Sequence, residues 1–283
     1  MADLQARMQQ DIAALRAALA LEMSEARIEV HMLLQAVLQV PRAWLLAHPE
    51  HVMSADDEKA YQTLLARRLA GEPMAHILGE REFYGLNLKV TPATLIPRPD
   101  TESLVEQALQ RLPSGNGVRV LDLGTGAGAV ALAIAYGRPQ AEVVAVDASA
   151  AALAVAQENA QRLALANVRC LLSDWFAGVP DTAFDLIVSN PPYIPDADPH
   201  LTQGDLRFEP RSALASGADG LADIRRIVAQ AGAYLKPGGW LLLEHGYDQA
   251  LAVRGLLQAA GFAEVFSARD LGGIERVSGG RQV

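Results

Sequence analysis

The chain has 283 residues, a length that favours two domains over one, and its 51% hydrophobic and 20% charged residues are ordinary for a globular protein. A net charge of −9 argues against a nucleic-acid-binding protein, because neutralising phosphates requires clustered Lys and Arg. One cysteine excludes a disulfide within the chain and is typical of a reducing compartment.

The start of the sequence lacks the basic-then-apolar pattern of a secretion signal, and no apolar stretch reaches the roughly 20 residues of a membrane span. We therefore expect a cytoplasmic protein. The histidines are scattered, without cysteine or carboxylate clusters at the spacing of metal ligands, so we expect no metal site. Cys170 falls on a predicted strand and is interpreted as a buried thiol rather than a nucleophile.

Residues 1–75 predict a small bundle of helices, because apolar residues recur at helical spacing in two segments. Ser24 and Ser54 are placed to cap helices at their N-termini. We expect most of this apolar surface to be the core of the bundle, with a groove for a protein partner as the functional alternative. The predicted stripes are Met8, Ile12, Leu15 and Leu19 in the first segment, and Ile28, Met32, Leu33, Ala36 and Val37 in the second.

Residues 76–99 form the predicted connection between two domains. The run from Ile77 to Val90 favours a β-hairpin with turn residues Gly85 and Leu86-Asn87. From Asp100 to the C-terminus, strand and helix patterns alternate, which is typical of a parallel sheet with helices on both faces. The sequence therefore predicts a helical domain (1–75), a hairpin linker (76–99) and an α/β domain (100–283).

A strand, a glycine loop and a helix follow one another early in the α/β domain. The strand pattern of 118–123 breaks at Gly124-Thr125-Gly126-Ala127-Gly128, and a helical run follows over 129–135. Glycines let a ligand approach the main chain, and a helix N-terminus offers free N–H groups to a carboxylate. The spacing G-x-G-x-G differs from the G-x-G-x-x-G of dinucleotide sites, so this loop is less suited to NAD. Close packing of strand and helix is the alternative explanation.

The next two predicted strands end in further candidate ligands. Asp147 ends the strand 141–147, about 20 residues past the loop, where a carboxylate binds ribose hydroxyls. After the strand 168–174, Trp175 could stack on an adenine or belong to the core, and Asp174 could accept from the adenine amine. A ribose, an amino-acid carboxylate and no pyrophosphate together describe S-adenosylmethionine, and the chain resembles a class I methyltransferase.

The tetrapeptide Asn190-Pro191-Pro192-Tyr193 follows the buried-strand pattern of 184–189, so we expect Asn190 to face a pocket beyond the carboxyl end of that strand. Neither proline has a backbone N–H, so the neighbouring carbonyls are rigid acceptors, which suit an NH2 group. Tyr193 supplies a flat face for a planar amide or base. We expect Asn190 and Pro191 to act in catalysis by orienting the nitrogen that is methylated, with a plain tight turn as the alternative.

Three later features complete the predicted domain. The stretch from Tyr193 to Gly220, rich in Pro, Asp and Gly, is expected to form a loop over the site. Lys236-Pro237-Gly238-Gly239 is expected to turn a helix into the next strand. His245 follows that strand and is interpreted as a structurally satisfied histidine.

Nearly the whole chain resembles the HemK/PrmC family of methyltransferases. The resemblance rests on the N-terminal helical segment, the loop 97–102, the Gly-Thr-Gly-Ala-Gly turn, the Asn-Pro-Pro-Tyr tetrapeptide and the run 208–214. It implies an α/β, Rossmann-like class I methyltransferase fold with a small N-terminal helical bundle. It also implies methylation of the glutamine in the Gly-Gly-Gln motif of peptide chain release factors.

The resemblance further assigns residues position by position. It implies that Gly124 to Gly128, Asp147 and Trp175 hold S-adenosylmethionine, and that Asn190 lies between cofactor and substrate. Asn190, Pro191, Pro192 and Tyr193 would bind the substrate glutamine. Arg98 and Arg211 also match the family, and for each we favour a structural salt bridge of the loop over a lid or substrate contact.

Other functions stay open at this point. A nucleic-acid adenine methyltransferase could use the same tetrapeptide, but residues 1–80 carry seven Lys and Arg against eleven acids. A non-catalytic module that keeps the cofactor fold has no physical need for Asn190 flanked by two prolines. A methyltransferase for another glutamine would share the catalytic residues. We expect a monomer without a stable nucleic-acid partner and without membrane association.

Overall fold

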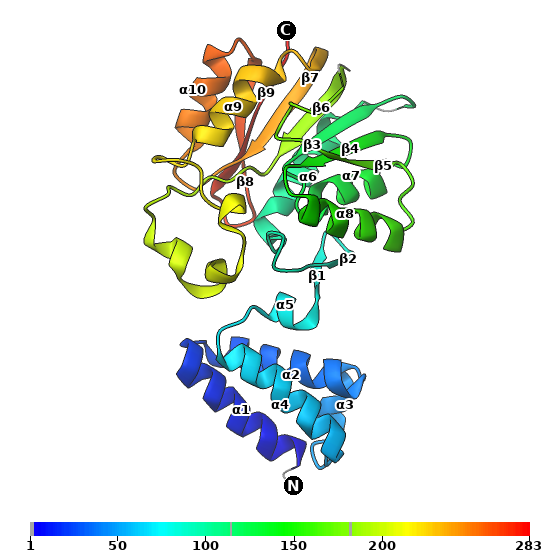
Figure 1. Cartoon of the computed structure of the whole chain (residues 1–283), viewed down its shortest axis with the longest axis vertical. Helices are drawn as coiled ribbons and strands as arrows, with labels where there is room; N and C mark the ends of the chain where they lie inside the picture. Colours follow the sequence, from blue (N-terminus) through cyan, green and yellow to red (C-terminus); the bar gives the residue numbers. More distant parts are fainter. Residues whose placement is uncertain (1–2, 114, 181–182) are drawn as a thin grey trace. The chain divides into compact units, whose positions relative to one another are not determined.

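The computed structural model describes residues 3–113, 115–180 and 183–283. It divides into two compact units, Met1–Gly79 and Glu80–Val283 (Figure 1). One buried apolar cluster belongs entirely to the first unit and two belong entirely to the second. Within the described part of the chain, no helix combines the length and the apolar character that crossing a membrane requires.

The first unit is helical, as predicted. Its helices are α1 (Leu4–Leu19), α2 (Met23–Leu38), α3 (Arg42–Ala47), α4 (Ala55–Leu69) and α5 (Met74–Leu78). Ile12 and Leu15 of the first predicted stripe are buried in the core, and Met8 and Leu19 pack against it. A buried hydrogen bond from the Tyr61 hydroxyl to Asp11 Oδ2, 2.9 Å long, joins α4 to α1 inside this bundle.

The predicted stripe of the second helix is partly wrong. Ile28 is 50% exposed, whereas the core face of α2 is formed by Ala26, Val30, Leu33 and Leu34. Successive helical residues are about 100° apart, so Ile28 points away from Ala26 and Val30, which lie two positions on either side of it. The buried face is hard to recognise because it includes a small alanine.

One of the two predicted caps is confirmed. The Ser54 hydroxyl accepts from the backbone N–H of Asp57 at 3.1 Å and begins α4. Ser24 instead lies inside the first turn of α2, whose N-cap is Glu22. The backbone N–H of Glu22 donates to Glu25 Oε2 at 3.1 Å, so a glutamate pair replaces the serine as the cap.

The predicted hairpin is present, but its bounds and turn differ. Strands β1 (Glu80–Phe83) and β2 (Leu86–Lys89) pair antiparallel, so Leu86 and Asn87 belong to a strand rather than the turn. The turn consists of Tyr84 and Gly85, both with positive φ, which suits the right-handed twist of a two-residue hairpin. Ile77 lies in α5 and not in the hairpin.

The second unit is built on a seven-stranded sheet with the order β5-β4-β3-β6-β7-β9-β8. The first five strands in that order are parallel, whereas β9 runs antiparallel to both β7 and β8. The short connection from β8 to β9 requires an antiparallel pair, which modifies the expected parallel sheet at one edge. The strands are β3 (Arg119–Leu123), β4 (Glu142–Asp147), β5 (Val168–Leu172), β6 (Phe184–Ser189), β7 (Leu235–Glu244), β8 (Ala263–Arg269) and β9 (Glu275–Arg281).

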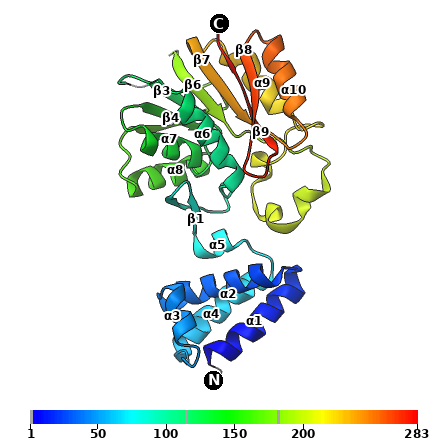
Figure 2. The same ribbon diagram turned by 180° about the vertical axis from the view of Figure 1, so that it is seen from behind.

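Helices cover both faces of this sheet, as predicted (Figures 1 and 2). Alternate residues of each strand face opposite sides, so Val143 and Ala145 join one core cluster while Val144 and Val146 join the other. The helices α6 (Glu102–Arg111), α7 (Ala129–Gly137) and α8 (Ala150–Arg162) pack on the first face, and α9 (Ala222–Ala231) and α10 (Ala250–Ala259) on the second.

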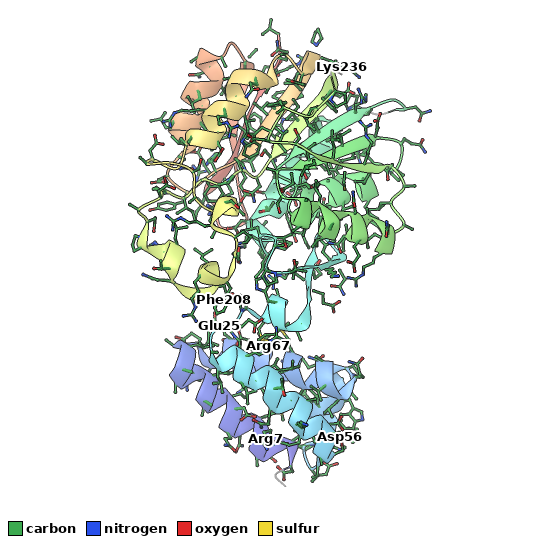
Figure 3. All side chains as sticks on the ribbon, in the orientation of Figure 1. Arg7, Glu25, Asp56, Arg67, Phe208 and Lys236 are labelled. Atoms are coloured by element: carbon green, nitrogen blue, oxygen red, sulfur yellow. The ribbon has the colours of Figure 1, made fainter. Side chains whose placement is uncertain are left out.

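The predicted turn at 236–239 lies inside a strand. β7 begins at Leu235, and its register against β6 shifts between Phe184 and Leu186, so the glycines form an irregular strand start. Lys236, labelled in Figure 3, donates from Nζ to Asp185 Oδ2 at 2.7 Å. This ion pair lies at the amino-terminal edge of the sheet.

Candidate active site

A pocket of about 380 Å³ lies at the carboxyl edge of the sheet. The ends of β3, β4, β5 and β6 meet there, because Leu123 pairs with both Val146 and Ser189, and Asp147 pairs with Leu172. Loops beyond the carboxyl ends of parallel strands are where such sheets bind ligands. Six of the predicted site residues line the pocket, namely Gly124, Gly126, Asp147, Trp175, Asn190 and Pro192.

The glycine loop contributes open space at one position and close packing at another. A Cβ on Gly126 would meet no atom within 4 Å, so a ligand has room to approach its Cα. A Cβ on Gly128 would lie 2.9 Å from Leu132 Cδ1, which fits a role in packing the start of α7. Both residues have positive φ, at 56° and 89°, a region that favours glycine. Thr125 and Ala127 line a neighbouring cavity of about 50 Å³, which shares Asn190 with the larger pocket.

Asp147 is held by two backbone groups. Its Oδ2 accepts from the N–H of Gly126 at 2.9 Å, and its Oδ1 accepts from the N–H of Ser149 at 2.8 Å. An ionised carboxylate has about four lone-pair positions, so each oxygen can still accept from a ligand. The carboxylate is therefore already oriented towards the pocket that it lines.

Trp175 faces both the pocket and the core. Its indole Nε1 donates to Asp223 Oδ1 at 3.2 Å, and its ring packs against the cluster under α9. A Cβ on Gly124 would lie 3.3 Å from this ring, so the loop and the indole are in close apposition. The two interpretations of Trp175, adenine platform and core residue, are therefore compatible.

Asp174 also lines the pocket, but it has a partner. Both of its carboxylate oxygens accept from Arg226 Nη2, at 3.1 and 3.0 Å. Arg226 lines the same pocket and had not been predicted from the sequence. A ligand amine would have to share Asp174 with this guanidinium.

Two residues of the tetrapeptide line the pocket and two do not. Asn190 and Pro192 line the pocket, whereas Pro191 is buried and Tyr193 is half-buried outside it. The Asn190 Nδ2 group donates to Thr101 Oγ1 at 3.2 Å, which leaves Oδ1 to accept from a ligand. The Tyr193 hydroxyl donates to Glu244 Oε1 at 3.4 Å, and burial raises the pKa of this phenol.

Three buried polar residues next to the pocket were missed. Asp122 accepts from the Thr125 hydroxyl at 2.6 Å and the Ala131 N–H at 3.2 Å, and burial raises its pKa to about 7. Burial likewise raises the pKa of Glu244 to about 7. Thr101 is 4% exposed and contacts Asn190. For the two acids, the available signal was a carboxylate within or at the end of an apolar strand, as in Leu241-Leu242-Leu243-Glu244.

The loop 194–220 lies over the pocket, as predicted, since Pro210, Ser212 and Ala213 line it. The loop contains the 3-10 helices η2 (Pro199–Thr202), η3 (Gly204–Phe208) and η4 (Arg211–Ala213). Arg98 forms an ion pair with Glu209 and so ties this loop to the segment before η1 (Pro99–Thr101). Arg211 donates to the Asp196 carbonyl at 2.7 Å. Among the described residues it has no carboxylate partner, so a backbone contact within the loop takes the place of the expected salt bridge.

His245 is structurally satisfied, which confirms the prediction. It is fully buried, with ring nitrogens 2.8 Å from Ser278 Oγ and 2.9 Å from the Gly246 carbonyl. Cys170 is half-buried rather than buried, and burial raises the pKa of its thiol, which disfavours the nucleophilic thiolate. In the described segments, no three His, Cys, Asp or Glu side chains gather in a way that could hold a metal ion.

Solved structures with the same architecture include a methyltransferase from Pyrococcus furiosus, with a TM-score of 0.55 and 20% identity, covering 78% of this chain and 98% of its own. The T. thermophilus 16S rRNA N2 G1207 methyltransferase, in complex with AdoMet and guanosine, has a TM-score of 0.53 and 24% identity and covers 72% of this chain and 50% of its own. The strand order and helix layers are those of a class I methyltransferase.

Sequence similarity narrows this class. Residues 12–79 match the PrmC N-terminal domain, and residues 101–205 match the methyltransferase small domain. The release factor glutamine methyltransferase of Pseudomonas aeruginosa is 53% identical over 90% of this chain and 92% of its own length. That of Bordetella pertussis is 58% identical, over 90% and 94%. The chain belongs to the family of release factor glutamine methyltransferases.

Proposed function

We propose that this protein transfers the methyl group of S-adenosylmethionine to the side-chain amide nitrogen of the glutamine in the Gly-Gly-Gln motif of peptide chain release factors. The observation that carries the proposal is the position of Asn190. It lines the same pocket as Gly126 and Asp147, and its Nδ2 group is occupied by Thr101. Its Oδ1 is therefore the acceptor that a substrate NH2 group would meet.

The residues present fit S-adenosylmethionine. A pocket of about 380 Å³ lies within the range of roughly 300–1,000 Å³ typical of small-molecule sites. The room beside the Gly126 Cα and the start of α7 (Ala129–Gly137) suit the amino-acid end of the cofactor. The Asp147 carboxylate suits the ribose hydroxyls, and the Trp175 indole suits the adenine. When bound, the cofactor supplies an electrophilic methyl group on a sulfonium.

The chain itself contributes positioning rather than a strong base. The nitrogen of an amide shares its lone pair with the carbonyl, so it is a poor nucleophile until it is oriented. Hydrogen bonds from its two protons to Asn190 Oδ1 and the Pro191 carbonyl favour a geometry in which the lone pair points at the methyl group. The nitrogen becomes acidic as its bond to the methyl carbon forms and the methyl–sulfur bond breaks, and its proton then leaves to water. Orientation of this kind lowers the barrier without proton transfer to the protein.

Release factors are the protein partners that this proposal requires. We assign the helical unit at the N-terminus to their recognition and place the reaction in the cytoplasm, where these factors act. Adenine in nucleic acid is the alternative amine, and the net charge of −9 disfavours it. Which of these two substrates the protein methylates can be measured directly.

Labelled S-adenosylmethionine offered to a purified release factor tests the proposal. We expect label on the intact factor, none on its variant with alanine in place of the Gly-Gly-Gln glutamine, and none on duplex DNA. Equal label on the factor and its variant would contradict the assigned glutamine. Label on DNA alone would replace the proposed substrate with a nucleic-acid base.

A further inference from the structure

Glu244 is a buried acid beside the candidate site that takes no part in the steps above. It ends β7 and is 1% exposed. The parallel strands β6 and β7 pair Ser189 with Leu243, so the residues that follow these two, Asn190 and Glu244, lie side by side, and Glu244 is still paired with Val277 of β9. A buried carboxyl group is costly unless it has partners, so the groups around Glu244 indicate what it does.

Two hydroxyl groups face the Glu244 carboxylate. The Tyr193 phenol donates to Oε1 at 3.4 Å, and the Thr101 hydroxyl interacts with the carboxylate and lowers its pKa against the larger effect of burial. Thr101 Oγ1 in turn accepts from Asn190 Nδ2 at 3.2 Å. Glu244 is therefore linked to both ends of the tetrapeptide, to Asn190 through Thr101 and to Tyr193 directly.

The direction of these hydrogen bonds depends on the ionisation of Glu244. A carboxylate only accepts, so an ionised Glu244 requires the Thr101 hydroxyl to donate to it. The Thr101 oxygen then offers a lone pair to Asn190, which donates its NH2 group and leaves Oδ1 free. A protonated Glu244 can donate to Thr101 instead. The Thr101 proton then attracts Asn190 Oδ1, which favours the opposite orientation of the amide.

Charged groups around Glu244 come from several elements. Arg276 on β9 lowers its pKa and Asp100 of η1 raises it, but burial is the largest effect and raises the pKa to about 7. Arg276 also lies 3.3 Å from Asp270 Oδ2 and 3.6 Å from Asp100 Oδ2, so its positive charge is shared with two other carboxylates. Among the described residues, no group donates a hydrogen bond of ordinary length and angle to Glu244 Oε2, so this oxygen can take a proton.

We propose that Glu244 is a positioning residue whose ionised form, acting through Thr101, fixes the Asn190 amide with Oδ1 towards the substrate and anchors the Tyr193 hydroxyl at the other end of the tetrapeptide. The kinetic consequences rest on the proposed function, since they assume that Asn190 orients the methylated amide. The hydrogen-bond relay itself can be observed without substrate.

Isosteric variants test the relay. We expect Glu244→Gln and Thr101→Val each to lower kcat about 10-fold or more, because either change removes the preference for one amide orientation. The KM for the release factor and the Kd for S-adenosylmethionine should change little. Thr101→Ser keeps the hydroxyl and should restore kcat. Asp185→Asn is the matched control, because Asp185 also accepts two hydrogen bonds on this sheet but at the opposite edge, and it should leave kcat unchanged.

The pH profile separates positioning from a merely structural role. The folded-state pKa of Glu244 is raised, so its ionised form accumulates only as pH rises through about 7. We expect the kcat of the wild type to rise as the pH passes through about 7, which gives the pH profile a rising limb. The pH profile of Glu244→Gln should lack this limb. An unchanged limb in Glu244→Gln, or full kcat in both Glu244→Gln and Thr101→Val, overturns the proposal. If Glu244→Gln does not fold, Thr101→Val and Thr101→Ser carry the test.

Nuclear magnetic resonance of the Asn190 side-chain NH2 protons gives a readout without methyl transfer. Their signals, assigned by their loss in Asn190→Ala, should shift with pH near 7 in the wild type and in Thr101→Ser, but not in Glu244→Gln. Signals that ignore pH in the wild type overturn the relay even if the enzyme is active. The expected shifts in a protein that does not methylate release factors would support the relay and reject the proposed substrate.

Discussion

At the scale of single residues, Asn190 and Asp147 hold different parts of one pocket wall. Asp147 is fixed by backbone N–H groups of the glycine loop and of the turn into α8. Asn190 is fixed by a side-chain contact to Thr101, a residue of η1. Since Asp147 is proposed to bind the cofactor and Asn190 the reacting amide, their substitution should affect different kinetic steps.

We expect Asn190→Ala to lower kcat about 100-fold or more, because a hydrogen bond made in the transition state contributes on the order of 2.7–4 kcal/mol. The Kd for S-adenosylmethionine should be less affected. Asp147→Ala should show the opposite pattern, with weaker cofactor binding first, since each charge-assisted hydrogen bond to the ribose contributes roughly 1.5–3 kcal/mol. Calorimetry with the cofactor and steady-state kinetics measure the two effects.

The exposed Asn87 on β2 provides the control, because Asn87→Ala removes the same amide at a position that does not line the pocket. Near-normal turnover in Asn190→Ala would remove the basis of the proposed mechanism. Unchanged cofactor affinity in Asp147→Ala would show that the ribose lies elsewhere.

At the scale of elements, a matched pair of serines tests helix capping in the first unit. We expect Ser54→Ala to lower the free energy of unfolding by about 1 kcal/mol, because it removes the acceptor for the Asp57 N–H. Ser24→Ala should be close to neutral, because Glu22 and Glu25 already cap α2. Urea unfolding of both variants measures the difference, and equal losses would contradict this assignment of the caps.

The same elements show which parts of the structure could be predicted. The glycine loop, Asp147 and Asn190 each follow a strand pattern, and the carboxyl ends of parallel strands meet at one edge, so local sequence was enough to place them together. The contact between Thr101 and Glu244 depends on sheet register and on the return of the chain through η1, so no local pattern revealed it. The prediction for Ser24 was wrong because Glu22, two residues earlier, can also cap α2 and does so in the structure.

At the scale of the whole molecule, the two units have separate cores. The cluster that contains Leu15, Leu33 and Tyr61 lies within the first unit, and neither cluster of the second unit includes a residue before Phe83. Each unit therefore has the apolar core that independent folding requires. Every residue that lines the proposed cofactor pocket belongs to the second unit. Cofactor binding and recognition of a large protein substrate should thus be separable.

We expect a fragment of residues 80–283 to unfold cooperatively and to bind S-adenosylmethionine with an affinity similar to that of the full chain. Its methylation of an intact release factor should fall roughly 100-fold or more, because the helical unit no longer positions the substrate. A short peptide with the Gly-Gly-Gln motif serves as the control, since both proteins should methylate it at similar low rates. Calorimetry, circular dichroism and label transfer provide the measurements. A fragment that methylates the intact factor as fast as the full chain does would show that recognition resides in the second unit, and the first unit would then need another explanation.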